Sequence, residues 1–123
     1  MILVDTSVWV DHLRHGNPVL QTLLRHDRVV CHPFIIGELA CGNLRHRTHI
    51  LDSLQTLSQA AVVVPEEVLQ FIDRNGLMGQ GLGYVDVHLL AAARLSRTWL
   101  WTLDRKLHQA ACRQGLAAPG VGL

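Results

Sequence analysis

Four of the ten acidic residues interrupt or end apolar segments, where carboxylates are uncommon. They are Asp5 after Met-Ile-Leu-Val, Glu38 within residues 34–41, Asp86 within residues 83–90, and Asp104 after residues 99–103. Desolvating a carboxylate costs several kcal/mol unless it is paired or coordinates a metal. One such acid could be accidental, but four in separate segments predict a shared site. Because most of them have no basic residue beside them, the site favours a hard divalent cation.

Taken singly, three of these acids also have an ordinary structural explanation. Asp5, Asp86 and Asp104 could each cap a helix. Each could also be a surface charge, but with Glu38 in mid-helix among apolar residues, the four together favour a site over four separate structural roles. The remaining six acids are typical of solvated faces, turns and helix starts.

Short apolar runs that are typical of strands alternate with helical patterns along the chain. This alternation predicts an α/β fold, a three-layer sandwich around a mostly parallel central sheet, in a single domain over residues 1–123. Strands are expected at residues 2–5, 28–31, 61–64 and 98–102. Helices are expected from the possible N-caps Thr6 and Ser7 to about 14, then at 19–26, 33–41, about 48–57, from 65 onward, 84–96 and 104–114.

The expected elements bring the four acids toward one edge of that sheet. In parallel sheets, functional sites form beyond the carboxyl ends of the strands. Asp5 is the last residue of the first expected strand, and Asp104 lies two residues beyond the last one. Glu38 and Asp86 lie in early turns of helices that follow a strand or a loop, so they can reach the same edge.

Composition limits the class of protein. Hydrophobic residues make up 49% and charged residues 17%, which indicates a globular chain. No apolar stretch approaches the roughly 20 residues that cross a membrane, and the N-terminus lacks the basic region of a signal peptide. The three cysteines, at 31, 41 and 112, are expected to be small buried residues in a reducing cytoplasm.

Charge alone says little, because the net charge is only +1. If the four acids converge, however, the rest of the chain has 11 Lys and Arg against six Asp and Glu, a balance of +5. A negative pocket filled by a cation within a mildly basic surface suits a polyanionic substrate.

The motifs around the four acids resemble those of the PIN-domain family. They are Val4-Asp-Thr-Ser7, Glu38 in a helix, Gly83-Tyr-Val-Asp-Val-His-Leu-Leu-Ala91 and Thr102-Leu-Asp104. Within that family the chain most resembles VapC toxins, the ribonuclease half of bacterial VapBC toxin–antitoxin pairs. The resemblance implies that Asp5, Glu38, Asp86 and Asp104 are catalytic and bind Mg²⁺ or Mn²⁺, with the Ser7 and Thr102 hydroxyls in support.

The implied reaction is hydrolysis of an RNA phosphodiester. Asp5, Glu38 and Asp86 are expected to be direct or water-mediated metal ligands, and Asp104 to orient water or complete a second metal position. Candidate phosphate contacts are Arg14, Arg45, Arg47 and Arg105.

The resemblance also implies partners. A VapB-like antitoxin would lie along a hydrophobic groove whose walls are expected near Trp9, Leu13 and residues 34–44. A homodimer and a higher assembly with the antitoxin are expected as well. Whether the chain acts as a toxin or as a PIN-fold RNA-processing nuclease stays open.

Other functions and other residues are weaker candidates. An aspartyl-phosphate enzyme would need a second Asp at Ser7 and a suitably placed lysine, and the chain has only Lys106. A non-catalytic partner-binding module would not need four acids. His46 and His49 favour a solvated, RNA-facing or partner-facing segment over a zinc pair. His88 is expected to be structural, His32 to be a loop residue, and residues 76–83 to form a flexible glycine loop. Trp99 and Trp101 are expected in the core or a dimer interface, although the tryptophans could also stack bases.

Overall fold

Four strands form the central sheet of the computed structural model, which describes residues 1–121. They are β1 (Ile2–Val4), β2 (Val29–Cys31), β3 (Ser58–Gln59) and β4 (Trp99–Trp101), in the order β3-β2-β1-β4. Every pair is parallel, with Ile2 opposite Val29 and Trp99, as expected for strands joined through helices. The C-terminal segment adds one parallel bridge beside β4, between Leu100 and Ala117.

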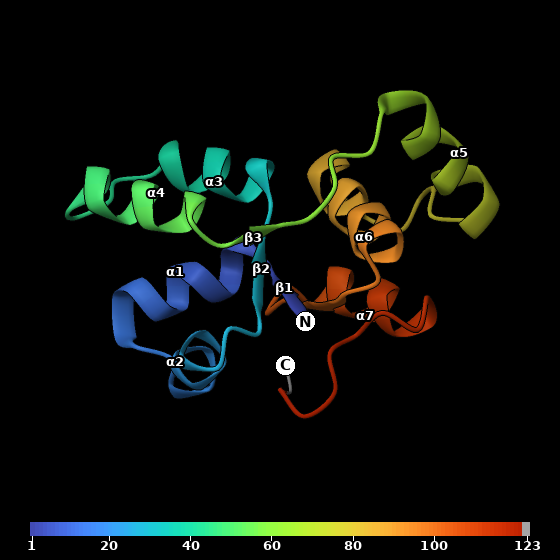
Figure 1. The fold of residues 1–123 in the computed structure, drawn as a ribbon. Helices are drawn as coiled ribbons and strands as arrows, with labels where there is room; N and C mark the ends of the chain where they lie inside the picture. The colour runs from blue at the N-terminus through green and yellow to red at the C-terminus, as the bar shows by residue number, and fades with distance from the viewer. Residues whose placement is uncertain (122–123) are drawn as a thin grey trace.

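Seven helices within the described residues surround this sheet. They are α1 (Thr6–His15), α2 (Pro18–Arg25), α3 (Pro33–Ala40), α4 (Arg47–Gln55), α5 (Pro65–Asn75), α6 (Tyr84–Ser96) and α7 (Arg105–Arg113). In Figure 1, α1 and α2 lie on one side of the strands and α6 and α7 on the other. The α/β fold class with a parallel sheet between helices is therefore confirmed.

Polar side chains at the helix starts explain several of these boundaries. Asn17 accepts the backbone N–H of Leu20 at 3.0 Å and caps α2, as its sequence position predicted. Asp5, not the expected Thr6 or Ser7, caps α1, because β1 ends one residue earlier than predicted. Both strand-ending acids are thus fixed at the point where a strand passes into a helix.

Helix α6 is the most deeply buried helix of the fold. Seven consecutive residues, Val87–Ala93, are buried, including three alanines that allow close approach of neighbouring elements. The helix packs between β4 and α5, so its first turn is held against the sheet by apolar burial. Within residues 1–121, no helix is long and apolar enough to span a membrane.

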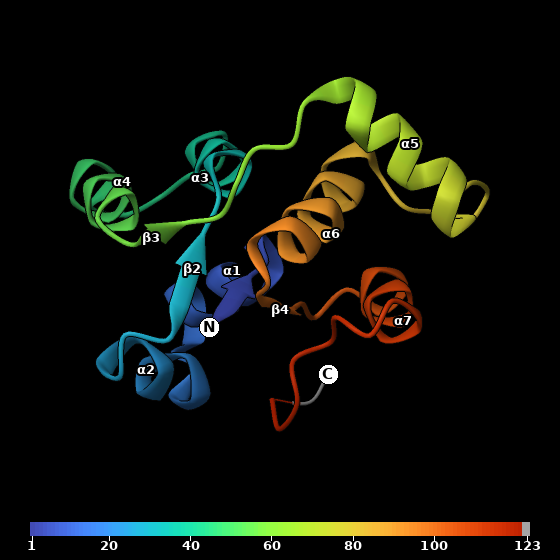
Figure 2. The same cartoon turned by 45° about the vertical axis from the view of Figure 1, so that its right-hand side comes forward.

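The expected strand at residues 61–64 is wrong. Pairing with β2 stops at Gln59 and Ala60, and the N–H of Ala61 bonds to the Ser96 hydroxyl at 2.9 Å. Figure 2 shows the chain leaving β3 and running to α5. The valine run has high strand propensity, but a strand also needs a partner, and here the chain leaves the sheet to bury Val63 in the core.

The expectation for the cysteines needs correction in part. Cys31 is buried as expected, but Cys41 and Cys112 are exposed. Trp101 lies in the core, as expected, whereas Trp99 at the start of the same strand is exposed. A dimer-interface position for Trp99 stays a prediction.

Candidate active site

Asp5 is the buried centre of the acidic site. Only 6% of the residue is exposed, and three bonds converge on its Oδ2. The Ser7 hydroxyl donates at 2.8 Å, the Thr102 hydroxyl at 2.7 Å, and the Ser7 backbone N–H at 3.4 Å. Hydrogen bonds to the charged form are what make a buried carboxylate tolerable at the end of an apolar strand.

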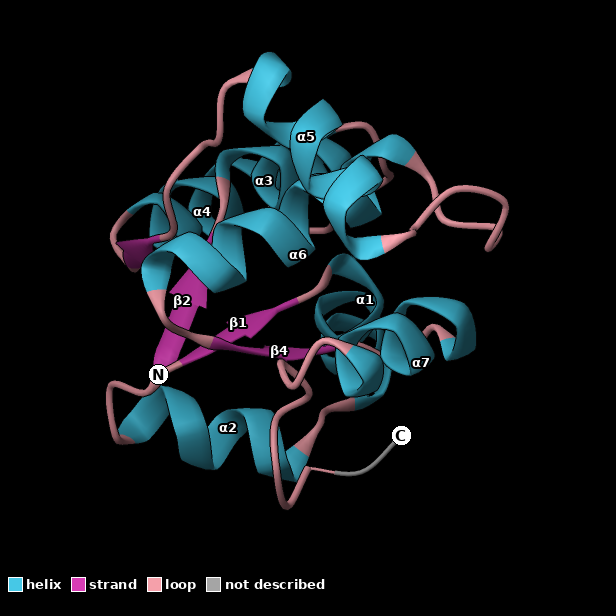
Figure 3. Ribbon diagram, turned by 90° about the vertical axis from the view of Figure 1, so that its right-hand side faces the viewer, coloured by secondary structure: helices cyan, strands magenta, loops and turns pink. Residues whose placement is uncertain are grey.

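The two hydroxyls are fully used in this arrangement. The Ser7 oxygen accepts the N–H of Leu103 at 2.9 Å, and the Thr102 oxygen accepts the N–H of Asp104 at 3.0 Å. Each hydroxyl has a single proton, and both protons point to Asp5. The Ser7 and Thr102 oxygens, which are 3.2 Å apart, are therefore in contact without a hydrogen bond between them. The network joins the ends of β1 and β4, which lie side by side in Figure 3.

Asp104 begins α7 at the same edge. Its Oδ1 accepts the N–H of Leu107 at 2.9 Å, which caps the helix. The capping role that the sequence allowed for this residue is therefore present. The cap uses only one of the two carboxylate oxygens of Asp104.

Glu38 and Asp86 come from helices. Glu38 is exposed on α3, and its Oε1 accepts the Thr6 hydroxyl at 2.6 Å. Asp86 is half-buried in the first turn of α6, and its Oδ2 accepts the N–H of Gly83 at 2.9 Å. Each helix-borne acid thus has one short bond to a neighbouring segment.

Electrostatics connects the four acids. Burial raises the pKa of Asp86 above its ordinary value, and the charges of Asp5, Asp104 and Glu38 raise the pKa further, while the Gly83 N–H acts in the opposite direction. These charge effects are consistent with four carboxylates near the carboxyl edge of the sheet, where the Thr102 hydroxyl joins Asp5 to the Asp104 backbone.

The donor set fits a hard divalent cation. Within residues 1–121, each carboxylate uses one oxygen in the bonds above, and the other oxygen receives no donor from a described residue. No three His, Cys, Asp or Glu side chains in that range lie close enough to hold an ion by themselves. Mg²⁺ keeps several of its waters and uses few direct protein ligands, so a cation here would be held largely through water.

Two buried histidines, His32 and His88, lie behind the site, and only His32 differs from its sequence expectation. His32, expected in a loop, is fully buried and caps α3, its Nδ1 accepting the Phe34 N–H at 2.9 Å. Burial and the nearby His88 lower the pKa of His32 to about 4, while the Ala61 backbone acts in the opposite direction. His88 is buried as expected, and burial lowers its pKa as well. A polar residue directly before a helix-starting proline was the available signal for the His32 cap.

A groove of about 770 Å³ lies beside Glu38, between α1 and the segment joining α3 to α4. We call it the α1–α3 groove. Its lining includes Leu13, Leu39 and Leu44 as well as Arg14 and Arg45. The expected wall at Trp9 is buried in the core instead.

The other two candidate arginines lie elsewhere at the surface. Arg47 donates to the Gly42 carbonyl at 3.3 Å, and Arg105 is the exposed first residue of α7, next to Asp104. His46, which also lines the α1–α3 groove, and His49 are both exposed.

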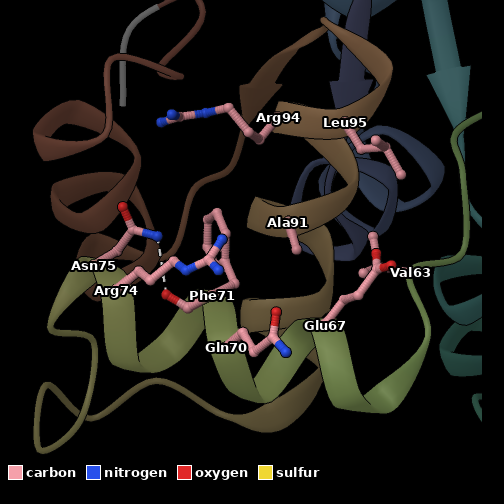
Figure 4. Close-up of a pocket in the computed structure, with 9 residues that line it drawn as sticks. All are labelled: Val63, Glu67, Gln70, Phe71, Arg74, Asn75, Ala91, Arg94 and Leu95. Carbon is pink, nitrogen blue, oxygen red and sulfur yellow. Dashed lines mark hydrogen bonds between the residues drawn. The ribbon is translucent and has the colours of Figure 1, made fainter.

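A second hollow, of about 520 Å³, lies between α5 and α6 and contains none of the four acids. Figure 4 shows its mixed lining, in which the Asn75 amide bonds to the Phe71 carbonyl. Arg94 points away toward the C-terminal segment, where it donates to the Gln114 carbonyl at 2.7 Å. Because its charged groups do not converge, this hollow is not the candidate active site.

Known proteins resemble the chain over most of its length. The PIN domain family model matches residues 2–112. Ribonuclease VapC32 of Mycobacterium tuberculosis, from strains CDC 1551 / Oshkosh and ATCC 25618 / H37Rv, is 46% identical over 118 residues, which cover 95% of this chain and 95% of that protein. The crystal structure of PAE2754 from Pyrobaculum aerophilum matches with a TM-score of 0.64 at 18% identity, over 89% of this chain and 83% of that one. The family resemblance drawn from the acidic motifs is confirmed.

Proposed function

The chain belongs to the PIN-domain family, and we propose on this premise that it is a metal-dependent endoribonuclease, the toxin of a type II toxin–antitoxin pair. The observation that carries the proposal is the hydrogen-bond network at the ends of β1 and β4, in which the Ser7 and Thr102 hydroxyls both donate to Asp5 and Thr102 also accepts the Asp104 N–H. The name of its relative, ribonuclease VapC32, supports RNA as the substrate class. We take residues 1–123 to be one nuclease domain.

In this proposal the four carboxylates hold Mg²⁺ or Mn²⁺ through their free oxygens. The bound cation supplies Lewis acidity, which neutralises charge on the phosphate and makes water a better nucleophile at neutral pH. Asp5, Glu38 and Asp86 are the ligands, directly or through water. Asp104 orients water or serves a second cation.

The chain's own residues set the geometry for this reaction. The hydroxyls of Ser7 and Thr102 fix one oxygen of Asp5, so that the other oxygen has a defined direction. Thr6 does the same for Glu38 with a single bond. Arg14 and Arg45 line the groove beside Glu38, and Arg105 adjoins Asp104, so these side chains are proposed phosphate contacts together with Arg47.

We further propose that a VapB-like antitoxin segment occupies the α1–α3 groove. The groove has apolar walls at Leu13, Leu39 and Leu44, and its lining includes Glu38, so a segment bound there would cover that acid. A homodimer and a higher assembly with the antitoxin follow from the family resemblance. Co-expression with a VapB-like antitoxin, followed by size-exclusion chromatography, tests this partner.

The first experiment is cleavage of total bacterial RNA by the purified, antitoxin-free protein with Mg²⁺ or Mn²⁺. Asp5→Asn is the decisive variant, because asparagine can still cap α1 and accept the two hydroxyls but carries no charge. Cleavage should fall to the level of an EDTA control while the circular dichroism spectrum is unchanged. Asp52→Asn, an exposed acid on α4, is the matched control and should cleave like the wild type.

Discrete fragments that disappear with EDTA and with Asp5→Asn would support the assignment, and their ends would identify the target RNA. A fully active Asp5→Asn protein would overturn the assignment of the site. Metal binding without cleavage of any RNA would point to a DNA substrate.

A further inference from the structure

Two aromatic side chains are strongly exposed within residues 1–121, and they lie at opposite edges of the sheet. Tyr84 is 51% exposed at the start of α6, and Trp99 is 43% exposed at the start of β4. Helix α6 ends at Ser96, just before β4 begins, so its first turn lies at the other end, where Asp86 bonds to Gly83. The exposed ring at the acidic edge is therefore that of Tyr84.

Tyr84 is supported from behind by a row of rings that we call the aromatic column, formed by His32, Phe34, His88 and Tyr84. Tyr84 meets His88 edge to face, with ring centroids 4.6 Å apart and planes at 89°. His88 meets Phe34 at 4.7 Å and 65°, and Phe34 meets His32 at 5.0 Å and 73°. Because the two histidines are buried, the column anchors an exposed ring to the core.

The aromatic column also connects the two helices that carry acids. Phe34 lies one turn before Glu38 on the same face of α3, and Tyr84 lies in the same first turn of α6 as Asp86. Tyr84 projects from the same side of α6 as His88, and Asp86 from another side, so the ring and this carboxylate share the first turn of the helix but not its face. The ring does not complete the core, since half of the residue is in contact with solvent.

We propose that Tyr84 stacks on a nucleobase of the RNA next to the phosphate that is cleaved, a role that rests on the proposed function. Single-stranded RNA is commonly bound by stacking its unpaired bases on aromatic side chains. Such stacking tolerates any base, because every base has a flat π-face. Tyr84 therefore positions one nucleotide and leaves sequence choice to other residues.

The test uses single-stranded RNA oligonucleotides with one 2-aminopurine, placed in turn at each position around the bond that the wild-type protein cleaves. Binding is measured with full-length Asp5→Asn protein, which retains the RNA intact. Stacking on Tyr84 predicts fluorescence quenching at one position. Tyr84→Ala and Tyr84→Leu should abolish this quenching and weaken binding roughly 5- to 100-fold, whereas Tyr84→Phe should retain both.

Tyr84→Leu keeps an apolar contact with His88, so it separates loss of the flat ring from a failure to fold. Trp99→Ala removes the exposed ring at the opposite edge and should change neither quenching nor binding. The same variants with Asp5 intact should lose cleavage in the same order. Unchanged quenching and cleavage in Tyr84→Leu would overturn the stacking role while the nuclease assignment stands, as would loss of both in Tyr84→Phe. A wild-type protein that cleaves no RNA would overturn the nuclease assignment, and the stacking role with it.

Discussion

The acidic site combines two pairs of residues that are held in different ways. The strand-borne pair, Asp5 and Asp104, follows β1 and β4, which are hydrogen-bonded neighbours in the sheet. The helix-borne pair, Glu38 and Asp86, comes from α3 and α6 and has one short bond each. Backbone pairing fixes the first pair, whereas side-chain packing fixes the second.

Because the two pairs are held differently, they should be sensitive to different perturbations. The strand-borne pair depends on the Ser7 and Thr102 hydroxyls, of which Thr102 is fully buried, so it should fail when one bond is removed. The positions of Glu38 and Asp86 depend on the aromatic column, and their carboxylates are affected by repulsion among the acids. This pair should therefore respond to pH and to the removal of a charge. Substitutions that affect one pair and spare the other can therefore separate the two mechanisms.

The largest expected effect concerns His32, which holds the start of α3. In the unfolded chain the imidazole binds a proton below its ordinary pKa of 6.5, whereas in the folded protein burial and His88 lower the pKa of His32 to about 4. The free energy of unfolding is therefore fully retained above pH 6.5 and should fall by up to about 3 kcal/mol as the pH drops toward 4. Urea unfolding across this range measures the slope.

His32→Asn is the informative variant, because asparagine can still accept the Phe34 N–H at the cap. It should lower stability at every pH, since it leaves a cavity, but it should flatten the slope. His49→Asn, at an exposed position on α4, should leave the slope unchanged. An equally steep slope in His32→Asn would show that other groups produce it.

The next effect concerns Thr102, which is fully buried and bonds to Asp5. Thr102→Val keeps the shape but leaves a buried carboxylate and the Asp104 N–H with one partner fewer. We expect a loss of about 2 kcal/mol in the free energy of unfolding and a roughly 10- to 100-fold slower cleavage rate. Denaturant titration and cleavage assays measure the two losses.

The same strand supplies a matched control at its other end. Thr98 is also buried, but its hydroxyl has no hydrogen-bond partner among the described residues. Thr98→Val should therefore keep full activity and equal or higher stability. Equal losses in both variants would mean that the hydroxyl bond to Asp5 is not what matters at Thr102.

The strand-borne pair was also the part of the site most accessible from sequence. The carboxyl ends of parallel strands meet at one edge, so local patterns at Asp5 and Asp104 were enough to bring them together. Nothing local brings His32 and Phe34 against His88, more than 50 positions later, and the aromatic column was not predicted. Taken alone, the sequence around each histidine predicts only a loop residue at His32 and a structural residue at His88.

The strand at 61–64 was wrongly expected for the same reason, because contacts between residues far apart in the sequence decide the outcome. Propensity in a valine run is local, whereas pairing depends on which backbone groups are free in the folded sheet. Here the N–H of Ala61 is taken by Ser96, which lies 35 positions away. The helix after Asn17 has a clear cap and needed no such distant information, and its boundaries were predicted within one residue.

A smaller effect is expected from charge in the helix-borne pair. Because the folded state raises the pKa of Asp86, its ionised form costs stability once the pH rises above that pKa. Asp86→Asn keeps an acceptor for the Gly83 N–H and removes the charge, so the metal-free protein should become slightly more stable at neutral pH while cleavage is lost. Thermal unfolding in EDTA measures the gain. Addition of Mn²⁺ should then stabilise the wild type and have little effect on Asp86→Asn.

The smallest effect is expected at Thr6, whose hydroxyl bonds to Glu38 at 2.6 Å. Thr6→Val is the same substitution as Thr102→Val, but water can replace the lost donor because Glu38 is exposed. The free energy of unfolding should therefore change by about 0.5 kcal/mol or less, and cleavage should slow only a few-fold, with recovery in Thr6→Ser. The ratio between the two Thr→Val losses measures how differently the pairs are held. If Thr6→Val were as damaging as Thr102→Val, the exposed bond would position Glu38 as firmly as the buried network positions Asp5, and the distinction between the two pairs would be lost.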